Sequence, residues 1–173
     1  MEYKSLYQSP LGPIELTCDE CGLTGIWLNG QKEREQTLIE AERPVFAETR
    51  RWLDLYFQGD TPDFMPPLHP KGTPFQQAVW AILQTIPYGQ TMSYGEIAAR
   101  IAAERGIEKM SAQAVGQAVG SNPLSILVPC HRVVGKNGNL TGYSGGMDYK
   151  IYFLKLEGVD LSQFFRPGKV PVL

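Results

Sequence analysis

The sequence has few cysteines and histidines and no long apolar run. Its 173 residues include three cysteines and two histidines. Three cysteines are too few and too scattered for a disulfide framework, and an odd number leaves at least one free thiol. No window approaches the roughly 18 apolar residues of a membrane span, and the start MEYKSLYQSP lacks an apolar run of signal-peptide type. We therefore expect a cytoplasmic protein with no membrane partner.

A large net charge is also missing, since the formal value is -2 at pH 7. The balance is uneven along the chain. Residues 1–72 carry 7 Lys and Arg against 12 Asp and Glu, whereas residues 73–173 carry 9 against 6. A mildly basic second half fits a domain that faces DNA, although a difference of this size also arises by chance.

The chain divides at a proline-rich segment. The stretch TPDFMPPLHPKGTP at 61–74 holds five of the thirteen prolines and has neither helical nor strand periodicity, so we interpret it as a linker. Upstream, short β-rich runs separated by PLGP and DECG predict consecutive hairpins, and a helix is predicted to begin near Pro44 and end at Gly59. The sequence predicts two domains, 1–72 and 73–173.

Beyond the linker the apolar residues recur at helical spacing. Three short helices are predicted over 74–87, 93–106 and 111–123, and Ser93 with Glu96 has the capping-box spacing that places a helix start at Tyr94. Three short helices joined by tight turns are typical of a helix-turn-helix. We therefore predict an α/β (α+β) protein with a mostly helical second domain.

The third predicted helix, AQAVGQAVG, has a bare face. Gln113, Gly116, Gln117 and Gly120 share one side of it, because residues three and four apart are neighbours on a helix. Glycine in a helix costs roughly 1 kcal/mol relative to alanine, so two glycines indicate that something approaches the backbone closely. Tight packing against another helix and a nucleic-acid groove are the two explanations.

Catalytic chemistry is indicated in ILVPCHRV at 126–133, where Cys130 precedes His131. A thiol with a pKa of about 8.5 is only a few per cent thiolate at neutral pH, so a nucleophilic cysteine needs a base. Neighbours in an extended chain point to opposite sides, which favours a bridging water. Glu157 is the best candidate to hold the imidazole in a triad-like relay. The alternative is that Cys130 is an inert buried thiol, His131 is a hydrogen-bonded surface or core residue without a catalytic role, and Glu157 is a solvated helix end.

The cysteines of CDEC at 18–21 have the spacing of a zinc half-site. Structural zinc usually needs four ligands, and the sequence offers no second Cys or His pair. We therefore expect ordinary hairpin residues and no metal.

These motifs resemble a known family. PCHRVV, preceded by SNPLSILV and followed by GYSGG and LKLEG, looks like the active-site block of the O6-alkylguanine-DNA alkyltransferases (methylated-DNA-protein-cysteine methyltransferases). GTPFQQAVWAILQTIPYGQTMSYGEIAARI resembles the lead-in to their helix-turn-helix. The specific match covers residues 73–158, and residues 1–72 agree only in general character. The resemblance implies an RNase H-like N-terminal domain and a C-terminal winged helix-turn-helix domain.

The resemblance also implies an activity and site residues. Cys130 would accept the alkyl group from O6-alkylguanine, with O4-alkylthymine as a further candidate, while His131 deprotonates the thiol through water and Glu157 orients His131. Asn122 matches a hinge asparagine, and Tyr94 matches the tyrosine that crowds the 3' phosphate and helps rotate the damaged nucleotide outward. The other residues implied to contact substrate or DNA are Gln113, Ala114, Gly116, Gln117, Arg132, Val133, Tyr143, Ser144 and Gly145.

The implied partner is alkylated double-stranded DNA bound through its minor groove, which would explain the bare helix face. The transfer would be irreversible, with one lesion per protein, no cofactor and a monomeric protein. Position 113 departs from the family, which commonly has an arginine finger there; Gln113 is shorter and uncharged, so we expect weaker substrate binding.

Two other functions are compatible with parts of the sequence. A lesion-binding module related to the alkyltransferases would recognise DNA without chemistry, but it is expected to lack the acceptor cysteine. A thiol hydrolase could use Cys130, His131 and Glu157 on acyl substrates; it would turn over repeatedly and would have no use for the glycine face.

Overall fold

The computed structural model describes residues 1–28, 37–141, 143, 146–166 and 170–172. The chain forms two compact units, Met1–Lys71 with Pro123–Leu127, and Gly72–Asn122 with Val128–Leu173. The chain first passes from one unit to the other in the proline-rich segment. The segment Pro123–Leu127 lies within the expected second domain but clusters with the first unit. Ile26 N of that unit donates a 2.8 Å hydrogen bond to Pro123 O.

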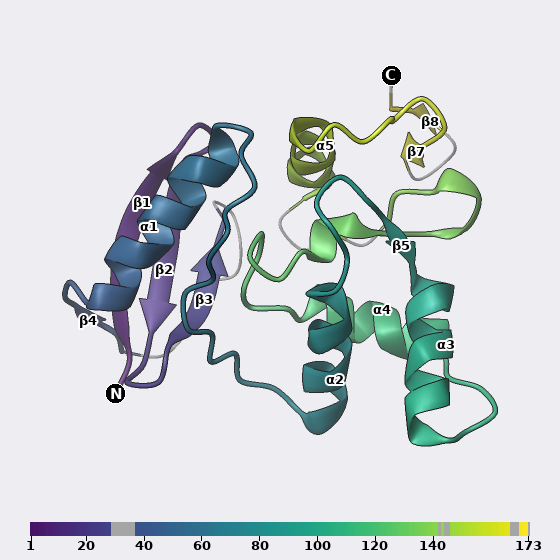
Figure 1. Cartoon of the computed structure of the whole chain (residues 1–173), viewed down its shortest axis with the longest axis horizontal. Coiled ribbons are helices and arrows are strands. Elements are labelled where there is room, and N and C mark those ends of the chain that lie inside the picture. The colour runs from purple at the N-terminus through teal and green to yellow at the C-terminus, as the bar shows by residue number, and fades with distance from the viewer. Residues whose placement is uncertain (29–36, 142, 144–145, 167–169, 173) are drawn as a thin grey trace. The chain divides into compact units, whose positions relative to one another are not determined.

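The first unit is a four-stranded sheet with a helix packed on it (Figure 1). The strand order is β3-β2-β1-β4; the first three strands form the antiparallel hairpins that the sequence predicts, and β4 pairs parallel to β1. The helix α1 packs against β1 and β2. The elements are β1 (Tyr3–Ser9), β2 (Gly12–Cys18), β3 (Leu23–Trp27), β4 (Ile39–Glu40) and α1 (Pro44–Phe57).

The core of this unit lies between β2 and α1. Ile14, Leu16 and Cys18 alternate along β2 and are buried, as are Phe46 and Leu53 on α1. The apolar side chains of β2 recur at period two and the buried residues of α1 recur at helical spacing, as expected where a helix covers a sheet face. Burial also raises the pKa of the Cys18 thiol to about 11, so this cysteine is a core residue and not a nucleophile.

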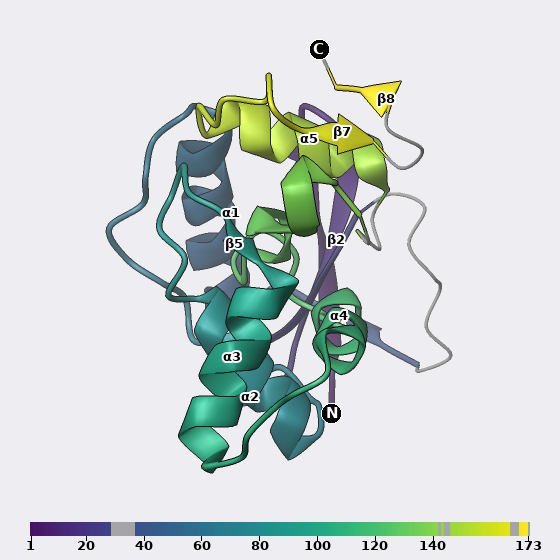
Figure 2. The same ribbon diagram turned by 90° about the vertical axis from the view of Figure 1, so that its right-hand side faces the viewer.

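The second unit is mostly helical (Figures 1 and 2). Its first three helices pack on one another, and its last helix packs on the short 3-10 turn that begins at Cys130. Two small sheets, β5 with β6 and β7 with β8, complete it. The elements are α2 (Pro74–Leu83), β5 (Met92–Ser93), α3 (Tyr94–Arg105), α4 (Ala112–Gly120), η1 (Cys130–Arg132), β6 (Val133–Val134), η2 (Lys136–Gly138), α5 (Met147–Leu156), β7 (Phe165–Arg166) and β8 (Val170–Pro171).

Side-chain caps set the starts of these helices. Ser93 accepts from Glu96 N at 3.0 Å, which confirms the predicted start of α3 at Tyr94. Thr73 and Gln76 form a reciprocal capping box at the start of α2. The helix ends were predicted less well: α2 stops at Leu83, before the predicted end at 87, because the chain turns there. Among the described residues, no helix is long and apolar enough to cross a membrane.

Packing does not explain the glycines of α4. Val115 and Val119 are buried, and Trp80 Nε1 donates to Ala118 O at 2.8 Å, so this side of the helix is well anchored. On the other side, a Cβ built at Gly116 would meet only the Tyr94 ring, at 3.8 Å, and one built at Gly120 would have no described atom within 4 Å. The tight-packing explanation is therefore not supported among the described residues.

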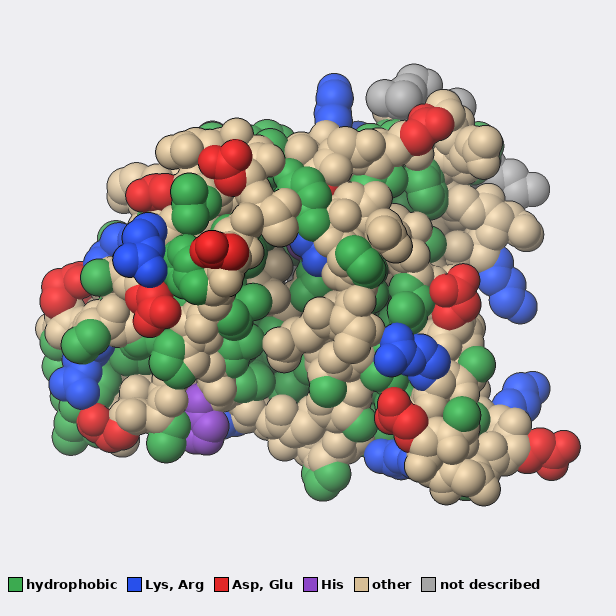
Figure 3. Space-filling view, viewed as in Figure 1, with side chains coloured by type: hydrophobic (Ala, Val, Ile, Leu, Met, Phe, Trp, Pro, Cys, Tyr) green, Lys and Arg blue, Asp and Glu red, His purple; other side chains and the backbone are tan. Residues whose placement is uncertain are grey.

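Charged side chains are distributed without a dominant patch on the face drawn in Figure 3, where acidic and basic groups are scattered. Buried charges are the exception. Arg132, Lys150 and Glu157 of the second unit are all buried. Two of the nine Lys and Arg residues in 73–173 are therefore unavailable to an external polyanion.

Gly120→Ala should raise the free energy of unfolding of the second unit by about 0.5–1 kcal/mol, because alanine is the better helix former and the added methyl meets open space. Urea unfolding followed by circular dichroism measures this. Gly106→Ala is the matched control: this glycine also faces open space, but it ends α3 in the left-handed region at φ 64°, so alanine there should destabilise the protein. A destabilising Gly120→Ala would contradict the open face.

Candidate active site

The chain turns at Cys130 instead of running straight. Cys130 N donates to Val128 O at 2.8 Å, and Arg132 N donates to Pro129 O at 3.0 Å, forming the 3-10 turn η1. The Cys130 side chain is buried at the start of this turn. The extended geometry on which we based the bridging water is therefore absent here.

The environment of Cys130 keeps its thiol protonated at rest. Burial raises the pKa of Cys130, and it does so against the opposing effects of the Asn122 side chain, the positive charge of Lys150 and the Tyr143 hydroxyl. A buried thiol of this kind is a poor nucleophile until a base removes its proton. The groups that would stabilise the resulting thiolate are already present around the sulfur.

His131 is oriented by Glu157. Their Nε2 and Oε2 atoms lie 2.6 Å apart, and both side chains are fully buried. A carboxylate accepts hydrogen bonds, so Nε2 carries the proton and Nδ1 is the basic nitrogen. Burial lowers the pKa of His131 although Glu157 acts in the opposite direction. The imidazole is therefore neutral near pH 7, as a general base must be.

Glu157 has two further partners that the sequence did not predict, Arg132 and the main chain of Gly89. Arg132 donates from Nε to Oε1 at 2.8 Å and from Nη2 to Oε2 at 3.1 Å, and Gly89 N donates to Oε1 at 3.0 Å. Burial on its own would raise the pKa of Glu157, but the bonds from His131 and Arg132 lower it to about 2. The carboxylate therefore stays charged across the physiological pH range.

Arg132 itself is held mostly inside the protein. Its side chain is only 10% exposed. Nη1 donates to Ile86 O at 2.7 Å, and Nε and Nη2 donate to Glu157. Three of its five N–H donors bind a carboxylate and a main-chain carbonyl inside the protein, so this arginine stabilises the site. The expectation that Arg132 contacts DNA stays a prediction.

Lys150 of α5 is a site residue that the sequence analysis missed. It is fully buried, and its Nζ donates to Val133 O and, at 2.9 Å, to Thr141 O. Burial lowers the pKa of Lys150 to about 8, and the Cys130 charge acts in the opposite direction. A spacing of seven residues puts Lys150 and Glu157 on one side of a helix, which is the signal that could have identified it.

Asn122 and Tyr94 complete the surroundings of the cysteine. Asn122 Nδ2 donates to Val128 O at 2.8 Å, which ties the end of α4 to the residue two before Cys130. The Tyr94 hydroxyl donates to Thr141 O at 3.0 Å, and burial together with the nearby Cys130 raises its pKa. Both side chains therefore interact with Cys130, while their roles as the hinge and as the tyrosine that crowds the 3' phosphate stay predictions.

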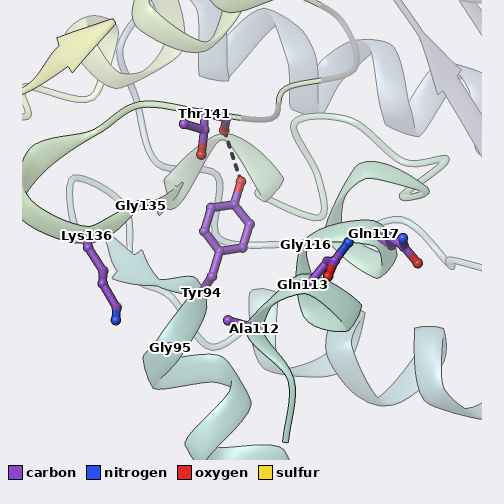
Figure 4. Close-up of a pocket in the computed structure, with 9 residues that line it drawn as sticks. All are labelled: Tyr94, Gly95, Ala112, Gln113, Gly116, Gln117, Gly135, Lys136 and Thr141. Carbon is purple, nitrogen blue, oxygen red and sulfur yellow. Dashed lines mark hydrogen bonds between the residues drawn. The ribbon is translucent and has the colours of Figure 1, made fainter. Parts of the chain in front are cut away.

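A pocket of about 520 Å³ opens beside Tyr94 (Figure 4). Its walls are the first turn of α3, the bare face of α4 and the loop after β6. Gln113, Gly116 and Gln117 line it, whereas Ala114 is half-buried and does not. Val133 and Tyr143 are buried near the site. Ser144 and Gly145 lie outside the described residues.

The sequence motif CDEC is part of a different cluster in the first unit. Asp19, Cys21 and His69 bring three metal-type ligand atoms within 4.8 Å of one another, and His69 Nδ1 lies 2.6 Å from Asp19 Oδ2. Three ligands are one fewer than structural zinc uses. Asp19 also caps the hairpin by accepting from Cys21 N and Gly22 N, which is the turn role that we expected for this stretch.

Two family models match the chain almost end to end. Residues 2–70 match the ribonuclease-like domain of 6-O-methylguanine DNA methyltransferase, and residues 74–159 match its DNA-binding domain. These matches confirm the predicted fold class of an RNase H-like domain followed by a helical DNA-binding domain.

Individual relatives agree with these models. A methylated-DNA-protein-cysteine methyltransferase of Methanosarcina acetivorans is 47% identical, over 90% of this chain and 98% of the relative. The constitutive enzyme of Bacillus subtilis is 39% identical over 94% of this chain and 99% of the relative. The crystal structure of Mycobacterium tuberculosis OGT in complex with DNA superposes with a TM-score of 0.78 at 38% identity, covering 98% of this chain and 96% of that one.

Both domain models come from one family, and relatives of nearly equal length belong to it as well. The chain therefore belongs to the methylated-DNA-protein-cysteine methyltransferase family.

Proposed function

We propose that this protein repairs DNA by transferring an alkyl group directly from O6-alkylguanine to Cys130. The observation that carries the proposal is the buried pair in which Glu157 holds a neutral His131, the residue that directly follows the buried Cys130. A module that only binds lesions would need no such relay. The names of its relatives and the DNA complex of a similar structure support the same activity.

The reaction requires the damaged nucleotide to leave the helix. The O6 atom of a stacked, paired guanine cannot reach a buried sulfur, so the base must rotate out at a cost of a few kcal/mol, less for a lesion that pairs poorly. His131 then takes the thiol proton through its Nδ1 side, directly or through water. The sulfur forms a bond to the alkyl carbon, the bond from that carbon to O6 breaks, and the guanine leaves by accepting a proton.

The product explains why the protein needs no cofactor and acts once. Sulfur bonded to an alkyl carbon is a thioether, which is not hydrolysed under ordinary conditions, so Cys130 is not regenerated. Each molecule would repair one lesion. O4-alkylthymine presents the same kind of alkyl oxygen and is a second candidate substrate.

The helix α4 is the proposed DNA-reading element, placed in the minor groove. The support is its open face: Gly116 leaves room beside the backbone where it lines the pocket, and Gln113 and Gln117 line the same pocket. Gln113 would occupy the space left by the flipped base, and Asn122 would act as the hinge behind it.

We further infer that residues 73–173 carry the whole site and that residues 1–72 serve as a supporting domain. We also infer that the protein acts as a cytoplasmic monomer with its thiols reduced.

Incubation with a duplex that carries one O6-methylguanine should raise the intact mass of the protein by about 14 Da, on Cys130 and on neither of the other cysteines, because only this thiol has a base partner. Mass spectrometry of the protein and its peptides measures the adduct and its stoichiometry of one. Continued turnover, an acyl adduct or unchanged transfer by Cys130→Ala would contradict the proposal.

His131→Ala should slow single-turnover transfer by about 100-fold or more, because the thiol loses its base. Binding of the same duplex should change little, since His131 is buried away from the surface. Quenched-flow transfer and fluorescence anisotropy measure the two quantities. Parallel losses of binding and transfer in His131→Ala would disprove the relay.

Glu157→Gln should also slow transfer, but it leaves Arg132 buried without a counter-charge and should therefore lower thermal stability as well.

Gly116→Ala should lower transfer from duplex DNA by about tenfold, because one methyl in a fitted site typically has an effect of this size. The added carbon would lie 3.8 Å from the Tyr94 ring, inside the pocket. Reaction with free O6-benzylguanine, which needs no groove, should fall much less. Gly120→Ala is the control in the same helix, outside the pocket lining. Equal rates for the two alanine variants on duplex DNA would place the DNA elsewhere.

A further inference from the structure

The pocket beside Tyr94 has a single charged side chain among the described residues that line it, and that side chain is Lys136. Lys136 belongs to the loop that follows β6. In Figure 4 it lies on the opposite side of Tyr94 from Gln113 and Gln117. A ligand that enters between α4 and this loop would therefore pass a neutral amide wall on one side and an ammonium group on the other.

The backbone that carries Lys136 is held in place. Gly135 N donates to Asn139 O at 2.7 Å, and Asn139 N donates back to Lys136 O at 3.1 Å, which closes the loop. Leu140 N then donates to Phe165 O at 2.7 Å and fastens the end of the loop to β7. A contact made by Lys136 would therefore require ordering only the lysine side chain, and not the loop.

The Lys136 ammonium is available to an external anion. Its side chain is exposed, and it forms no ion pair with a carboxylate of the described residues. Several other cations of the second unit are engaged inside the protein or at its surface. They are Arg132 with Glu157, Lys150 with two carbonyls, Arg166 with Asp148, Arg105 over the Phe75 ring and Arg100 with Thr85.

We propose that Lys136 binds a backbone phosphate of the DNA next to the flipped nucleotide, and so supplies the positive charge that Gln113 does not. A lysine ammonium acts as a point charge and suits a phosphodiester without requiring a fixed approach angle. The other described residues that line the pocket are neutral, and several of them are small, which would let a sugar-phosphate chain approach. This proposal rests on the proposed function, because it takes the ligand to be duplex DNA.

Salt dependence tests the proposal, because each phosphate contact made by a cation releases counterions from DNA. The probe is a labelled duplex with one O6-methylguanine, bound by Cys130→Ala protein so that no reaction occurs, and read by anisotropy. In this background Lys136→Gln should weaken binding roughly three- to tenfold at low salt and reduce the slope of log K against log salt by about one. Its loss of affinity should shrink about threefold between about 50 and 200 mM salt.

Two variants control the measurement. Lys136→Arg keeps the charge and should keep both affinity and slope. Lys155→Gln removes an exposed lysine of α5 that does not line the pocket, so it should leave the slope nearly unchanged. An unchanged slope in Lys136→Gln, or an equal loss in Lys155→Gln, would overturn the proposal.

The same set of proteins separates this inference from the proposed function. If the unmodified protein takes up the methyl group but Lys136→Gln binds with an unchanged slope, only the phosphate contact is wrong. If the unmodified protein takes up no methyl group, the proposed function fails, whatever the slope. A fall in the thermal midpoint of Lys136→Gln that Lys136→Arg does not restore would assign the residue a structural role and also overturn the phosphate contact.

Discussion

The buried carboxylate of Glu157 is the interaction on which the active site depends. It accepts hydrogen bonds from His131, from two nitrogens of Arg132 and from Gly89 N, so one side chain joins the end of α5, the cysteine turn and the loop after α2. A buried ion is costly unless it is paired and fully hydrogen-bonded. Here both conditions hold, which makes the carboxylate a fixed point for the imidazole and couples the catalytic geometry to the stability of the second unit.

Burial of the Cys130 thiol and the His131 imidazole has a chemical consequence. It raises the pKa of Cys130 and lowers the pKa of His131, so the resting pair is neutral, and a thiolate forms only at the cost of an adjacent imidazolium. Lys150 and Asn122 reduce that cost by acting on the sulfur. A resting thiol of this kind is protected from oxidation and from stray electrophiles, which would matter for a protein that, as we propose, uses its cysteine once.

Local signals made most of the elements predictable. Pro44, the serine cap at Ser93 and the alternation along β2 each act within a few residues, and the Cys130, His131 and Glu157 constellation was visible as residue types at suggestive places. Contacts between distant segments were not readable from the sequence. The burial of Arg132 needs Ile86 and Glu157, the role of Lys150 needs Thr141, and Pro123–Leu127 joins the first unit through Ile26, so each depends on the tertiary fold.

The helix α4 shows how function accounts for a choice that stability alone would not favour. Nine residues with two glycines make a weak helix, and nothing among the described atoms requires either glycine. Its serine cap, two buried valines and the bond from Trp80 hold it in place from the inner side. The residues on the outer side of α4 can therefore be small without loss of the helix. If DNA binds here as we propose, a strand that approaches this surface would meet backbone, amide side chains and one lysine. Charge attraction would then be weak, and close fit would be the main basis for selecting a flipped base.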